Sequence, residues 1–149
     1  MSVPYDVFAK AFLAKVTDFG FADMLDFDRT SSVDGYMKRA ISSFRHVSQY
    51  DLSTTADDNI REFLVDIPAE DLDELADIIS EGMVAQWLKP YAYNQENLEA
   101  AMSTKDYSKY SPVELLNRIS GTYAKVQRDF VNMTREYSYN HGDLGDLHL

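Results

Sequence analysis

The sequence predicts an all-α protein, a bundle of four main helices with short helical pieces and an irregular C-terminal tail. Three observations support this fold class. The chain has 149 residues, of which 45% are hydrophobic, and this suits a single domain (1–149) with one core. Apolar side chains recur at helical spacing in four segments. Alternating, strand-like patterns are almost absent.

The first helix is expected over about 4–16, with Ser2 as its cap and Pro4 in its first turn. Its apolar stripe consists of Tyr5, Phe8, Phe12 and Val16. The segment 19–28 that follows is too rich in aromatic residues for a free loop. We expect it to be an irregular link that packs beneath the helices.

The second helix is expected to begin near Ser31 or Ser32 and to carry a single core-facing stripe. That stripe consists of Val33, Tyr36, Met37, Ala40, Ile41 and Phe44. A polar connection follows, and a short helix from Asp57 or Asp58 is predicted to carry Ile60, Phe63 and Leu64. Alternatively, 64–67 is briefly extended.

The third helix is long, about 68–89, with acids in its first turns, where the helix dipole favours them. Apolar residues cover more than one of its faces, so we predict a central helix with neighbours on two sides. Gly82 inside it indicates a close helix crossing. Pro90 is expected to stop the helix, and a short helical piece is expected at 96–102.

The last helix has the clearest start, a capping box at Ser111–Glu114 with Pro112 at the first helical position. A heptad-type seam follows, suited to packing on another helix of this chain or of a neighbouring one. The seam consists of Leu116, Ile119, Tyr123, Val126, Phe130, Met133 and Tyr137. Residues from about 138 to 149 are predicted to form a poorly ordered tail.

Charge excludes some partners. The formal net charge is −11, which disfavours binding to a nucleic-acid backbone. Eleven acids lie between Asp51 and Glu81 against Arg61 alone, whereas six basic residues outnumber three acids between Lys105 and Arg135. The simplest interpretation is a solvated acidic face. The alternative is that acidic and basic faces of neighbouring copies meet and set the register of self-association.

The usual patterns of catalytic and cofactor sites do not occur, so we assign no catalytic residue, no cofactor and no metal site. The chain has no cysteine, and no run of about 18 apolar residues predicts a membrane span. His141 and His148 are a weak metal pair in the predicted tail. The acids of 71–77 lack the glycine and glutamate of a calcium loop and are interpreted as a solvated helix face. A paired-carboxylate site stays open, but nothing singles one out.

Aromatic residues are the remaining excess, with ten tyrosines, eight phenylalanines and one tryptophan. Several tyrosines fall in connections or at helix ends, where a ring can serve a partner surface or fold back over its own bundle. Together with residues of the tail they form our predicted partner-binding set: Tyr107, Tyr110, Tyr137, Tyr139, His141 and Leu144.

One order of features points to a family. After an acidic helix come Gly82-Met83-Val84 with Trp87-Leu88, then Leu98 and Met102, then 103–111, and a closing group made of Tyr137, Tyr139, Asn140, Asp143 and Leu144. This order resembles small virion proteins of tailed bacteriophages, placed in the head–tail connector, or neck, group. The resemblance covers about 68–144, roughly half of the chain, and the N-terminal third carries none of it.

The resemblance implies a non-enzymatic subunit of a ring below the portal, twelve-fold to match it, that joins head to tail in the virion. Such a protein would be assembled in the cytoplasm of the bacterial host, and its partners would be the portal, tail or neck proteins and copies of itself. DNA would slide through the channel without sequence-specific binding, which an acidic surface would serve. Two alternatives stay open: a soluble acidic helical adaptor or regulatory module that binds another protein, and an enzyme with an acidic site that the sequence does not mark.

Overall fold

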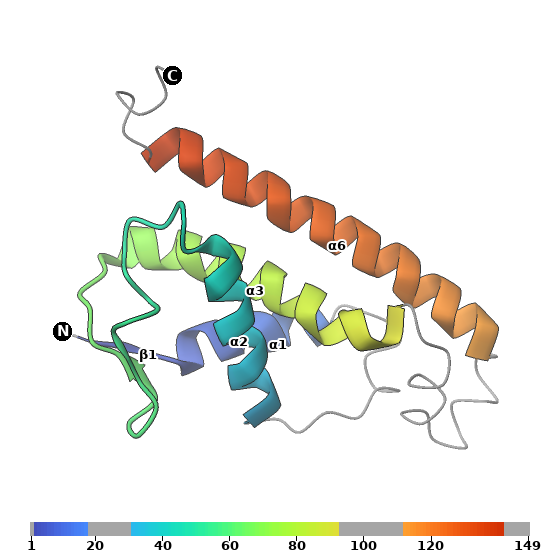
Figure 1. Ribbon diagram of the computed structural model, residues 1–149, viewed down its shortest axis with the longest axis horizontal. Helices are drawn as coiled ribbons and strands as arrows, with labels where there is room; N and C mark the ends of the chain where they lie inside the picture. The colour runs from blue at the N-terminus through green and yellow to red at the C-terminus, as the bar shows by residue number, and fades with distance from the viewer. Residues whose placement is uncertain (1, 18–30, 93–111, 142–149) are drawn as a thin grey trace.

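The computed structural model describes residues 2–17, 31–92 and 112–141, and in these ranges the protein is mostly helical. The helices found there are α1 (Asp6–Thr17), α2 (Ser31–Phe44), α3 (Ala69–Ala92) and α6 (Pro112–His141), as Figure 1 shows. The predicted all-α fold class is confirmed. The expected link at 19–28 and the expected short helix at 96–102 lie outside the described residues.

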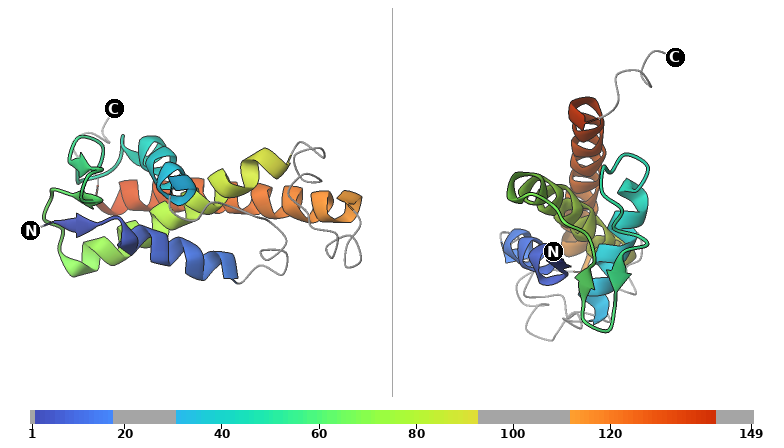
Figure 2. Two further views of the ribbon diagram at one scale, coloured as in Figure 1. Left: turned by 90° about the horizontal axis from the view of Figure 1, so that it is seen from below. Right: turned by 90° about the vertical axis from the view of Figure 1, so that its left-hand side faces the viewer.

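Helix α3 is the central element, as its two-sided apolar pattern predicted. It contacts α1, α2 and α6. Leu75, Ile79 and Met83 have no exposed surface, and neither do Trp87 and Leu88 farther along the helix. In Figure 2, α1, α2 and α6 surround α3 from different sides. Burial of apolar area on several faces of one helix therefore holds the bundle together.

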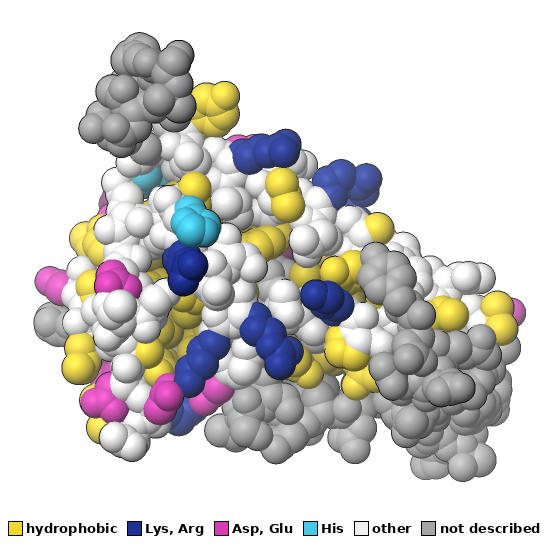
Figure 3. Space-filling model, viewed as in Figure 1, with side chains coloured by type: hydrophobic (Ala, Val, Ile, Leu, Met, Phe, Trp, Pro, Cys, Tyr) yellow, Lys and Arg dark blue, Asp and Glu magenta, His cyan; other side chains and the backbone are white. Residues whose placement is uncertain are grey.

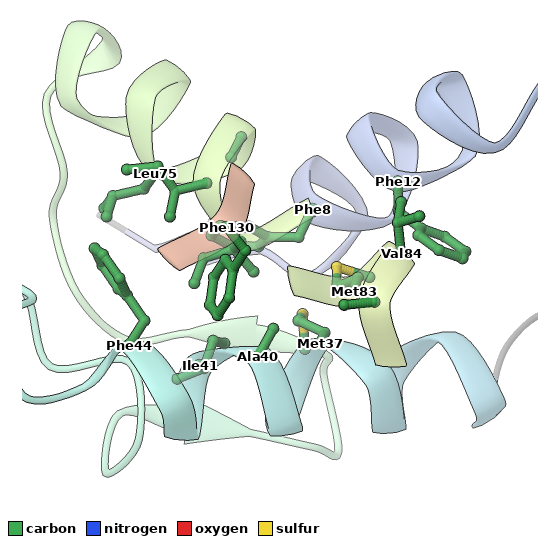
Figure 4. Close-up of a cluster of buried hydrophobic side chains, with 14 of the residues drawn as sticks. Phe8, Phe12, Met37, Ala40, Ile41, Phe44, Leu75, Met83, Val84 and Phe130 are labelled. Atoms are coloured by element: carbon green, nitrogen blue, oxygen red, sulfur yellow. The ribbon is translucent and has the colours of Figure 1, made fainter. Parts of the chain in front are cut away.

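The core forms where α2 and α6 both reach α3. Figure 4 shows a row of α2 side chains, Met37, Ala40, Ile41 and Phe44, that face the other helices, with Phe130 of α6 above them. The predicted stripe of α2 is buried except for Tyr36, which is half-buried. A Cβ atom built on Gly82 would lie 2.9 Å from the Cβ of Ala40. The close helix crossing predicted at Gly82 is confirmed.

Helix α6 uses its heptad seam within its own chain, against α3. Ile119, Val126, Phe130 and Tyr137 are buried, and the other members of the seam that are described are partly buried against the core. The helix extends to His141, so 138–141, which were predicted to belong to the tail, are part of α6. The side chain of His141 lies 2.5 Å from a carboxylate oxygen of Glu74 on α3, which anchors this last turn.

The predicted short helix at 57–64 is wrong. A small antiparallel sheet of β1 (Val3–Pro4), β2 (Ala56–Asp57) and β3 (Glu62–Phe63) takes its place, in the order β1-β3-β2. Phe63 pairs with Val3 and Ala56, and its aromatic ring lies 4.7 Å from that of Tyr5. Burial of Phe63 against residues far away in the sequence therefore makes this segment a strand. The helical spacing of its apolar residues could not reveal these distant partners.

Two helix ends also differ from expectation. Pro4 lies in β1 instead of the first helix, and the hydroxyl of Ser2 donates to Glu62 instead of capping that helix. Pro90 does not stop α3, which continues to Ala92. A proline inside a helix removes one backbone hydrogen bond and crowds the carbonyl group four residues before it, a local cost that tertiary contacts can offset. Burial of Ala92 and a hydrogen bond from the hydroxyl of Ser120 to its carbonyl oxygen (2.5 Å) stabilise the extra residues.

Candidate interaction surfaces

A groove with a volume of about 230 Å³ lies between α2, α3 and α6. Gly82 and Phe130 contribute to it at the helix crossing, and Val131 is 37% exposed along it. The remaining described residues that line this α2–α3–α6 groove are polar: Ser43, Gln86, Gln127, Thr134 and Arg135. None of the described lining residues is acidic, which is notable in a chain with a net charge of −11.

The surface around this groove is basic. Figure 3 shows Lys and Arg side chains gathered over α2 and α6 on the face turned to the viewer. Exposed basic residues on these two helices and directly after α2 are Arg39, Arg45, Arg118, Lys125, Arg128 and Arg135. Lys38 of α2 is also exposed and is bound to Asp58. This basic face is the part of the described protein that best suits an acidic partner.

A second surface is the turn of the β2–β3 hairpin, which projects from the end of the bundle on the side away from α6 (Figures 1 and 2). Ile60 in the turn is 54% exposed, and Leu64 directly after β3 is 57% exposed. Acids flank both residues on either side in the sequence: Asp51, Asp57, Asp58, Glu62 and Asp66. We call the segment 57–64 the hairpin tip.

Ion pairs hold the hairpin tip on the helices. The guanidinium of Arg61 donates two hydrogen bonds to the carboxylate of Asp34 on α2, at 2.8 and 2.9 Å, and one to Asp6 on α1. Arg61 has a φ angle of 53°, a left-handed conformation that costs a non-glycine residue of the order of 1 kcal/mol. The paired carboxylates offset that cost and raise the pKa of Arg61, with the hydrogen bonds that Arg61 donates to Asp34 as the main cause.

Asp58 makes a second connection from the hairpin tip to the helical bundle. Its carboxylate accepts hydrogen bonds from Lys38 of α2, at 2.8 Å, and from the hydroxyl of Tyr5, at 2.7 Å. Both bonds lower the pKa of Asp58, and the bond from Lys38 has the larger effect. Burial and the bond to Asp58 raise the pKa of Tyr5. The hairpin tip therefore has a defined position relative to α1 and α2.

The acids of 71–77 lie on a partly exposed helix face, as predicted, and three of them also bind other parts of the chain. Tyr50 donates a 2.5 Å hydrogen bond to Asp71, and this bond is the main reason that the pKa of Tyr50 rises to about 12. Asp77 forms an ion pair with Lys15 of α1 at 2.9 Å. With the contact of Glu74 to His141, three acids of α3 connect this helix to three other parts of the chain.

The structure places the predicted partner-binding residues in different environments. Tyr139 is 74% exposed at the end of α6. Tyr137 is 2% exposed, because its ring packs against Phe44 with 4.9 Å between ring centres. Tyr137 therefore folds over its own bundle instead of offering an exposed contact. His141 is engaged with Glu74. The remaining members, Tyr107, Tyr110 and Leu144, lie outside the described residues.

Sequence reasoning missed Ile60 and Leu64, which it assigned to the apolar face of a helix. The signal that marks them is the run Asp57-Asp58-Asn59 directly before Ile60, because Asp and Asn favour turns. A second hollow, of about 220 Å³, lies where α2 ends and is lined by 41, 44–45 and 48–53. Both a base, Arg45, and an acid, Asp51, line this hollow, whereas the described lining of the α2–α3–α6 groove contains a base and no acid.

Across 2–17, 31–92 and 112–141, no group of three or more His, Asp or Glu side chains is arranged to hold a metal ion. No helix of these ranges has both the length and the apolar character needed to cross a membrane. The chain matches no protein-family model, no curated protein and no solved structure.

Proposed function

We propose that this protein is a non-enzymatic virion structural protein: a head–tail connector, or neck, subunit that forms a ring between the portal and the tail. The observation that carries the proposal is the position of two chemically opposite surfaces on one helical bundle. The basic groove face lies over α2 and α6, and the acidic hairpin tip projects on the side away from α6. Subunits of a closed ring need two different, mutually complementary surfaces.

The resemblance of 68–144 to neck proteins supports the proposal from the sequence. Two residues that carry it, Gly82 and Trp87, lie in the core of the bundle and bear on how the helices pack. Tyr139 and Asn140 are the described residues of the closing group that are exposed. The resemblance thus includes both framework and surface positions.

The charge of the chain suits the proposed location. A channel through which DNA slides should not retain it, and a chain with a net charge of −11 repels phosphate. In this proposal the partners are the portal, a tail or neck protein and further copies of the chain. The protein is assembled into the virion in the cytoplasm of the bacterial host.

The test is the mass of the purified protein in solution, measured by light scattering alone and after mixing with a purified portal. A species many times larger than the 17.0 kDa chain, or a stable complex with the portal, is the expected result. The control mixes the portal with an unrelated acidic helical protein of similar size. A species that stays at 17 kDa under all conditions and ignores the portal would overturn the proposal.

The α2–α3–α6 groove favours one alternative, an adaptor or regulatory module that binds another protein. A groove of about 230 Å³ with an apolar floor is suited to a side chain or short segment of a different partner. Such a module would remain a monomer or dimer in solution, so the same light-scattering measurement separates the two functions.

A further inference from the structure

We propose that the hairpin tip of one copy docks into the α2–α3–α6 groove of the next, with Ile60 placed against Phe130 and Val131. The inference rests on the self-association that the proposed function requires, but it does not depend on a location in the virion. The occupant of the α2–α3–α6 groove is therefore a second copy of this chain.

One small hairpin exposes two large apolar side chains. Ile60 and Leu64 are each more than half exposed, although β3 between them buries Phe63. Single exposed apolar residues are common at protein surfaces. Here, however, both lie on a segment that stands out from the bundle, and their burial against a partner would contribute to association.

The hairpin tip is held in shape before it binds. Arg61, directly after Ile60, keeps its left-handed conformation while bound to Asp34 and Asp6. The bonds of Asp58 to Lys38 and Tyr5 fix the other side of the turn. A segment that is already ordered loses little conformational entropy on docking, so more of the contact energy appears as affinity.

The groove matches the hairpin tip in charge and polarity. Phe130 and Gly82 line its apolar part, and its one charged described lining residue is Arg135. The hairpin tip contains three acids, Asp57, Asp58 and Glu62, against Arg61 alone. Ile60, which follows Asp57 and Asp58 and precedes Glu62 after Arg61 in the sequence, therefore meets a groove whose described lining holds a base and no acid, and this favours the pairing over one with an acidic surface.

The position of the two surfaces determines what kind of assembly follows. The hairpin projects away from α6, whereas the groove runs along α6, so the two do not meet within one molecule (Figures 1 and 2). A contact between unlike surfaces leaves a free hairpin on one end and a free groove on the other. Repetition then produces a closed ring or an open chain of subunits. A nucleic acid would match the arginines but would leave the exposed Ile60 and Leu64 of the hairpin tip unexplained.

The absence of cysteine from the chain permits a direct test. Ile60→Cys and Val131→Cys are made as separate variants with tags of different length, mixed, and exposed to oxidised glutathione. The expected product is a mixed disulfide dimer that forms at least ten-fold faster than in the control mixture of Ile60→Cys with Val113→Cys. Val113 is 55% exposed on α6 and does not line the groove, so it matches Val131 in residue type and helix. Equal rates in the two mixtures would overturn the inference.

A second measurement tests the contact without cross-linking. Ile60→Asp and Arg135→Glu are each expected to weaken self-association at least ten-fold, seen as a lower mass by light scattering at matched concentration. Lys10→Glu on α1 is the charge-matched control, because Lys10 is exposed and does not line the groove. Circular dichroism checks that all three variants remain folded.

The outcomes separate this inference from the proposed function. If the protein assembles with the portal and none of the variants changes this assembly, the docking mode is overturned and the proposed function stands. The mixed disulfide together with no binding to a portal would support the docking mode and count against the neck protein. If an oligonucleotide binds the protein, and Arg135→Glu abolishes this binding without changing the mass of the protein, the groove binds nucleic acid and the inference is overturned.

Discussion

Gly82 of α3 lies so close to Phe130 of α6 that a Cβ atom on the glycine would be 2.8 Å from Cε1 of the phenylalanine. The same atom would be 2.9 Å from the Cβ of Ala40 on α2. Three helices therefore meet at a position where only a hydrogen atom fits. The crossing brings α2 and α6 together and also contributes the floor of the groove between them.

Gly82→Ala is expected to lower the free energy of unfolding by about 1–2 kcal/mol, because overpacking outweighs the gain in helix propensity. The end of the Phe130 ring can shift, but the Cβ of Ala40 moves only with its helix. Urea unfolding measures the difference. Gly121→Ala is the control, since nothing lies within 4 Å of its position, and it should raise stability by up to about 1 kcal/mol. A gain in both variants would contradict the tight crossing.

Tyr137→Phe is expected to destabilise the protein by about 0.5–1.5 kcal/mol, whereas Tyr139→Phe should have no measurable effect. The hydroxyl of Tyr137 accepts a 3.1 Å hydrogen bond from the backbone N–H of Gln49, and its removal leaves that part-buried donor unpaired. Tyr139 is 74% exposed on the same helix and provides the matched control. Urea unfolding of the two variants decides; equal stabilities would show that the bond to Gln49 contributes nothing.

Asp58→Asn is expected to remove part of the loss of stability in acid. The folded-state pKa of Asp58 is lowered below the ordinary value of 3.8, so its contribution is present above pH 3.8 and is lost as the pH falls through this value toward the folded-state pKa. Urea unfolding gives the midpoint of the variant and of the parent, and the difference between the two midpoints at pH 7 is compared with the difference at pH 3. Asp73→Asn on the exposed face of α3 is the control. A difference that does not shrink in acid would contradict the role of the Lys38 and Tyr5 bonds.

Tyr50→Phe is expected to flatten the alkaline end of the stability profile. The unfolded side chain titrates near 10.0 and the folded one at about 12, so the folded state binds more protons between these values and stability falls as the pH rises through them. Thermal unfolding at pH 8, 10 and 11 measures the slope for parent and variant, with the exposed Tyr139→Phe as control. Parallel slopes would contradict the bond between Tyr50 and Asp71.

The bounds and faces of the helices were largely predictable. Phe8 and Phe12 of α1, Met37 of α2 and Ile119 of α6 are all buried, as their spacing indicated. The central place of α3 followed from apolar residues on several of its faces. Gly82 predicted the close crossing because glycine in a helix interior lowers stability unless something else requires it. Each of these features depends on residues within a few turns of one another.

The hairpin and the interaction surfaces depended on contacts between distant parts of the chain. Phe63 pairs with Val3, and Arg61 binds Asp34, across separations that a local pattern does not contain. Likewise, Tyr137 looked like an end-of-helix tyrosine until Phe44 packed against it. The sequence by itself determined which segments become helices and which of their faces are apolar, since that information is periodic and local. Only the tertiary structure decided where Ile60 projects and which helices form the groove, because these positions follow from how the faces pack together in space.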